Sequence, residues 1–169
     1  MLAVEESLSA PPGEVFAILS GDVDHCFKLL EVTLGDPNAA DREDFGESEV
    51  RNYVRAAFAC IEGMTFCMNA WMAQQNASAG GGEAPLEQWA DLESNVTSMF
   101  NQLDQVMRIE PQLGTGRQWW ASFQLAIQLR HRMAHPLASG DLCLSREEIL
   151  TIVDADAGFR LLLSRYLEV

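Results

Sequence analysis

The sequence is poor in positive charge. Lys28 is its single lysine, and 11 basic residues stand against 25 acidic ones, which gives a net charge of −14. Such an acidic chain does not hold nucleic acid by general electrostatic attraction. The charge is nevertheless uneven, because residues 111–140 contain no Asp or Glu and three arginines, Arg117, Arg130 and Arg132. We therefore expect a local patch that attracts phosphate on a surface that otherwise repels it.

The sequence also lacks the patterns of a redox, zinc-knuckle or membrane protein. None of its four cysteines forms a C-x-x-C pair, and Cys60 and Cys67 fit one face of a helix as small buried hydrophobes. Residues 1–10 show no basic segment typical of a signal peptide, and no apolar run approaches the roughly 20 residues that span a bilayer. We expect a soluble, cytoplasmic protein.

Apolar residues recur mostly at intervals of three and four, the spacing of amphipathic helices, and no segment shows strand alternation. Ser145 and Glu148 form the S-x-x-E pattern of a capping box, and Pro136 must end the helix before it. Gly21 and Gly158 are positions where a helix could break or bend. These signals predict one all-α domain over residues 1–169, an antiparallel bundle of about five helices. The expected helices are 14–34, 48–75, 86–107, 117–135 and 146–168.

The segment Leu129–Pro136, "LRHRMAHP", holds the unusual residues of the fourth helix. On a helical wheel Arg130 lies near the centre of the apolar stripe, where an unpaired guanidinium is costly. Either Glu62, itself oddly placed in the apolar "FACIEGMTF", neutralises Arg130, or Arg130 faces a groove or a subunit interface and binds phosphate. Arg132 is expected to point to solvent.

The same segment does not fit a metal or nucleophile site. His131 and His135 are four residues apart, as in the zinc motif H-E-x-x-H, but Arg132 replaces the glutamate and opposes a cation. There is no G-x-S-x-G motif and no Walker loop. We therefore expect neither a metal nor another cofactor.

The pattern Arg130-His131-x-x-x-His135 resembles the R-φ-x3-H signature of HEPN domains, the helical domains of many prokaryotic toxins and RNA-cleaving defence proteins. The segment "YVRAAFACIEGMTF" (Tyr53–Phe66) is similar to the helix that precedes this motif in several HEPN-like families. "LRHRMAHPLASGDLCLSREEI" resembles their motif helix, proline stop, loop and final helix. The resemblance covers about Val50 to the C-terminus.

This resemblance implies a metal-independent endoribonuclease, a toxin or defence protein, whose Arg and His meet across a homodimer interface. Carried over, Arg130 would hold the scissile phosphate, and His135 would act as general base or acid. His131 would position one of these groups, Glu62 would orient Arg130, and Arg55 would be a more distant contact. The implied partners are RNA and an antitoxin or other protein, with no membrane.

A second reading stays open, in which the domain is a non-catalytic HEPN-like module. In it the Arg–His motif holds helices together, and the acidic surface meets a protein or nucleotide partner.

Overall fold

Five α-helices make up most of the described chain. The computed structural model describes residues 10–36, 44–45, 48–78, 91–110 and 118–167. The helices are α1 (Pro12–Gly35), α2 (Ser48–Ser78), α3 (Leu92–Met107), α4 (Gln118–Ala134) and α5 (Arg146–Leu167). The predicted all-α bundle is therefore confirmed.

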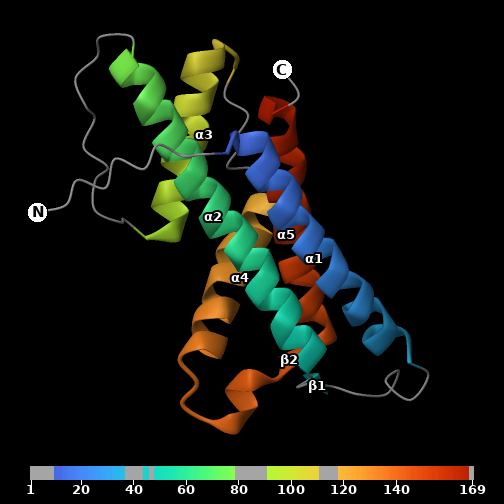
Figure 1. Cartoon of the computed structure of the whole chain (residues 1–169). Coiled ribbons are helices and arrows are strands. Elements are labelled where there is room, and N and C mark those ends of the chain that lie inside the picture. The colour runs from blue at the N-terminus through green and yellow to red at the C-terminus, as the bar shows by residue number, and fades with distance from the viewer. Residues whose placement is uncertain (1–9, 37–43, 46–47, 79–90, 111–117, 168–169) are drawn as a thin grey trace, which may run out of the picture.

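The longest helix, α2, organises the bundle. Figure 1 shows α2 running the full length of the molecule, from the strand pair at one end to the level of α3 at the other. α1 packs along α2, α4 packs along α5, and α2 also contacts α5 and α3. One apolar core joins them, since each helix contributes fully buried side chains, among them Leu30, Met64, Phe100, Phe123 and Phe159.

A short strand pair closes one end of the bundle and departs from the prediction of no strand. β1 (Asp44–Phe45) pairs antiparallel with β2 (Leu144–Ser145), and the buried Phe45 and Leu144 face each other in register. Two residues are too few for the alternation that identifies a strand in sequence. The 3₁₀ helix η2 (Ser139–Leu142) precedes β2, so the segment after α4 returns to the beginning of α2.

Most helix boundaries lie within a few residues of their predicted positions, but the start of α3 was predicted wrongly. The helix begins at Leu92 rather than Leu86, because Asp91 has an extended backbone and its carboxylate accepts the Ser94 N–H at 2.9 Å. This is an N-cap, which satisfies a backbone donor that the first turn leaves unpaired. The predicted positions 86–90, 117 and 168 lie outside the described residues.

The two glycines inside helices play different roles. α1 continues unbroken through Gly21, where a Cβ would meet nothing within 4 Å. At Gly158 a Cβ would lie 2.6 Å from the Cβ of Trp119, so glycine is what allows α4 and α5 to approach so closely. Within the described ranges, no helix combines the length and apolar character needed to cross a bilayer.

Candidate functional site: an arginine-lined groove between α2 and α4

The basic segment Leu129–Pro136 forms the end of α4. The helix ends at Ala134, and the His135 N–H still donates to the His131 carbonyl at 3.0 Å, which completes the last turn. Pro136 follows, as its effect on the preceding backbone predicts. Asp141 then orders the exit loop, since its carboxylate accepts the N–H groups of Leu137 and Ala138 at 2.7 and 2.9 Å.

Arg130 forms an ion pair with Glu62, which is one of the two arrangements expected from the sequence. Its Nη2 lies 2.8 Å from the Glu62 Oε1, and the two side chains are 41% and 38% exposed. The guanidinium carbon also lies 6.0 Å from the centre of the Phe58 ring, within range of a cation–π contact. Arg130 and Glu62, the two charged residues on otherwise apolar helix faces, therefore neutralise each other's charge. Both side chains still remain in contact with solvent.

Arg130 lies on the wall of a groove of about 410 Å³ between α2 and α4. Arg51 and Arg55, one turn apart on α2, line the same groove, so three arginines share it with one glutamate. Apolar side chains make up the rest of the lining, namely Val54, Phe58, Ala59, Met133, Ala134 and Leu142. A lining that combines arginine and apolar side chains suits a ligand that carries both anionic and apolar groups.

A second hollow of about 490 Å³ lies on the other side of the Arg130–Glu62 pair. Both residues line it too, together with Gly63, Thr65 and Phe66 of α2 and two residues of α3, Leu92 and Asn95. The side chain of Phe66 is large, apolar and 46% exposed. The two hollows are therefore neighbours along one face of α2, separated by a single ion pair.

The two predicted histidines lie outside both hollows. His131 and His135 are exposed and stack loosely on each other, with their ring centres 4.9 Å apart. Neither is among the residues that line the groove of Arg130. Within one chain the structure thus brings Arg130, Glu62 and Arg55 together, and leaves His131 and His135 on the surface beside them.

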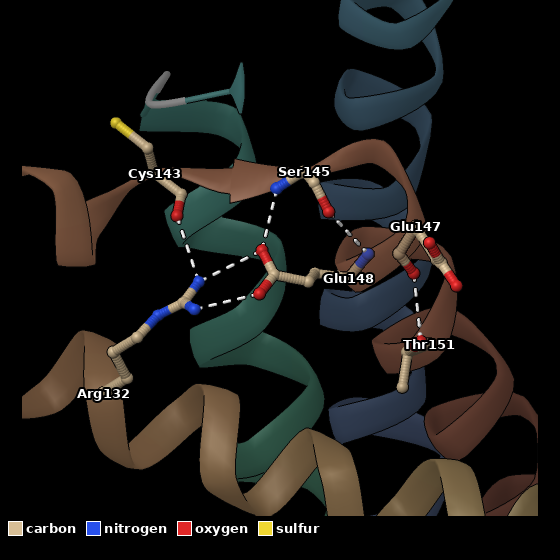
Figure 2. Close-up of polar contacts among 6 residues, drawn as sticks. All are labelled: Arg132, Cys143, Ser145, Glu147, Glu148 and Thr151. Atoms are coloured by element: carbon tan, nitrogen blue, oxygen red, sulfur yellow. Dashed lines mark hydrogen bonds and ion pairs between the residues drawn. The ribbon is translucent and has the colours of Figure 1, made fainter. Parts of the chain in front are cut away.

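Arg132 does not point to solvent as predicted (Figure 2). Its guanidinium donates to both carboxylate oxygens of Glu148, at 2.9 and 3.1 Å, and to the Cys143 carbonyl at 3.2 Å. Glu148 also accepts the Ser145 N–H at 2.9 Å, and its own N–H donates to the Ser145 Oγ, which confirms the capping box. Hydrogen bonding from Arg132 lowers the pKa of Glu148. This Arg132–Glu148 clasp ties the end of α4 to the start of α5.

A buried polar cluster was missed by the sequence reasoning. Asp156 of α5 is 1% exposed and accepts hydrogen bonds from Tyr53 at 3.4 Å and from Arg160 at 3.2 Å. Arg160 continues to Asp24 of α1 at 2.7 Å. Burial raises the pKa values of both Asp156 and Tyr53. A helical wheel would have identified Asp156 as an inward-facing residue, because it lies four residues after the buried Ile152. The contacts of this cluster join α1, α2 and α5 and do not form an open site.

Two residues of the hollows also escaped the sequence analysis. Arg51 lies one turn before Arg55, and Phe66 lies one turn after Glu62, so both fall on the same face of α2. This spacing of one helical turn could have identified both residues from the sequence. Among the described residues, no group of three or more His, Cys, Asp and Glu side chains is arranged to hold a metal ion.

Comparison with known proteins adds no assignment. No family model, no curated protein and no solved structure matches the chain.

Proposed function

We propose that this chain is a HEPN-like endoribonuclease that cleaves RNA without a metal ion. The observation that supports this proposal best is the setting of Arg130. It is a half-exposed arginine, held by Glu62 on the wall of an arginine-lined groove, in a protein of net charge −14. A guanidinium that is always charged and presents a planar fork of donors is suited to a phosphate.

In the proposed reaction the RNA 2′-hydroxyl attacks the adjacent phosphorus, and the bond from phosphorus to the 5′-oxygen breaks. The products are a 2′,3′-cyclic phosphate and a 5′-hydroxyl. Arg130 stabilises the charge that develops on the phosphate oxygens. His135 transfers a proton as general base or acid, the role that histidine takes most often among catalytic side chains. His131 positions His135, Glu62 orients Arg130, and Arg55 adds a second positive charge to the groove.

The position of the histidines favours a proposed site that is built from two chains. Neither histidine lines the groove of its own chain, so Arg130 of one copy would meet His135 of a second copy across a homodimer interface. An antitoxin or other protein would then restrain the nuclease by covering this groove or this interface.

The test is RNA cleavage in EDTA by wild type, Arg130→Ala and His135→Ala. We expect the wild type to leave cyclic phosphate ends and each variant to be inactive. A mixture of the two inactive variants should recover part of the activity, because a mixed dimer keeps one site with both Arg130 and His135. Equal background cleavage by all three proteins would refute the nuclease.

The alternative is a non-catalytic HEPN-like module that binds a nucleotide or a protein. Two observations favour it: Glu62 already pairs with Arg130 within the chain, and neither His131 nor His135 is among the described residues that line that groove. The two functions separate on expression in a bacterial host. An active nuclease slows growth and His135→Ala relieves the effect, whereas a binding module leaves growth unchanged in both cases.

A further inference from the structure

One face of α2 carries two arginines, a glutamate and a phenylalanine in register. Arg51, Arg55, Glu62 and Phe66 follow one another at intervals of four, seven and four residues, so they form a single stripe along the helix. Arg51 and Arg55 line the first hollow, Phe66 lines the second, and the Glu62–Arg130 pair borders both. At 1.5 Å per residue this stripe is about 22 Å long, and it follows the helix that spans the whole bundle in Figure 1.

We propose that this stripe is the binding track for single-stranded RNA, with the phosphates held by Arg51 and Arg55 and a base stacked on Phe66. The inference rests on the proposed function and names the residues that select and hold its substrate. Arg51 and Arg55 reach the strand upstream or downstream of Arg130, so they bind phosphates that are not cleaved. The track has room for about six stacked nucleotides.

The chemistry of the stripe favours a single strand over other anionic ligands. Proteins that hold single strands combine a positive groove for the backbone with aromatic side chains on which bases stack. A duplex hides its base faces and gains nothing from Phe66. An acidic peptide gains from the arginines but carries no base, and a mononucleotide is too short to reach from Arg55 to Phe66.

The experiment measures binding without cleavage. The parent protein carries His135→Ala and is assayed in EDTA. It is titrated into a fluorescently labelled RNA decamer at several salt concentrations. Arg51→Gln combined with Arg55→Gln tests the phosphate contacts, with Arg165→Gln, on the exposed surface of α5, as the single-charge control. Phe66→Ala tests stacking, and Leu161→Ala is its control, because Leu161 is 63% exposed and lies on α5. Ala59→Phe fills the first hollow without changing its charge.

The two kinds of variant should leave different signatures. Loss of both arginines should weaken binding about tenfold and reduce the slope of log affinity against log salt by about 0.7 for each lost phosphate contact. Phe66→Ala should weaken binding about tenfold with an unchanged slope. Ala59→Phe should weaken binding, and both controls should bind as the parent does. Adenosine monophosphate and a glutamate decapeptide should compete poorly.

The outcomes separate this inference from the nuclease itself. Loss of binding in the arginine and Phe66 variants supports the track even if the wild type cleaves no RNA. Cleavage by the wild type together with unchanged binding in these variants overturns the track and leaves the nuclease standing. Absence of RNA binding in the parent, equal losses in the Arg165 control, or tighter binding of the glutamate peptide than of RNA would each overturn the track.

Discussion

Glu148 stabilises the fold in two ways, through its ion pair with Arg132 and through its capping hydrogen bond, and two substitutions should separate these contributions. Glu148→Ala removes both the bidentate ion pair and the side chain that accepts the Ser145 N–H. Arg132 and Glu148 are 36% and 30% exposed, so solvent screens the pair and limits it to about 0.5–1 kcal/mol. The capping contact contributes about 1 kcal/mol more. Glu148→Ala should therefore lower the free energy of unfolding by about 1.5–2 kcal/mol.

Glu148→Gln separates the two contributions. Glutamine can still accept the Ser145 N–H in a capping box, so this variant should lose only the ion pair, about 0.5–1 kcal/mol. Urea unfolding at pH 7, followed by circular dichroism, measures both variants. Glu147→Gln is the matched control, because Glu147 is exposed and lies in the same first turn of α5. It changes the helix-dipole interaction equally without touching Arg132.

A double-mutant cycle with Arg132→Met gives the coupling directly and supplies the refuting result. The pKa of Glu148 lies below its ordinary value of 4.5, so the coupling should be complete above pH 4.5 and should fall as the pH drops through the lowered pKa. A coupling near zero at pH 7, or one that persists unchanged at low pH, would contradict the assignment of this clasp as an ion pair.

Two further predictions concern packing and thiol reactivity. Gly158→Ala should cost about 2 kcal/mol in urea unfolding, because the new Cβ would lie 2.6 Å from Trp119; Gly21→Ala, which meets nothing within 4 Å, should instead stabilise α1 by up to about 1 kcal/mol. Burial raises the pKa of Cys60 to about 11, so brief alkylation at pH 8 should modify the half-buried Cys143 and spare Cys60 until urea unfolds the protein. Equal stability of the two glycine variants, or alkylation of native Cys60, would show that the packing is looser than described.

Helical periodicity carries enough information to predict the bundle and one feature of the candidate site. Arg130 and Glu62 each stood out as a charge on an apolar stripe, and a buried or half-buried charge needs a partner of opposite sign. Their pairing could therefore be predicted from two separate helices without knowing how these pack.

Other features were not predicted, because a helical wheel shows the faces of one helix and not how separate segments of the chain pack together. Arg132 lies on the polar side of α4, and its partner Glu148 arrives only because the chain turns back after Pro136 through η2 and β2. The start of α3 was missed for a local reason, since Asp91 is an N-cap inside a run whose apolar spacing continued upstream of it. Phe66 was not singled out from the sequence, because its exposed fraction of 46% depends on how the helices pack and not on its residue type.

The acidic charge of the chain and the arginines of the groove act over different distances. Screening limits the repulsion between exposed acids and an approaching strand to about 8 Å at physiological salt, whereas Arg51 and Arg55 would touch the phosphates they bind. Added salt therefore weakens a repulsion at long range and an attraction at contact, and the two effects on affinity have opposite signs. The salt slope of the intact protein can be shallow even when the arginines bind RNA. The repulsion is common to the parent and the arginine variants, so it cancels when their slopes of log affinity against log salt are subtracted. This difference in slope gives the number of phosphate contacts.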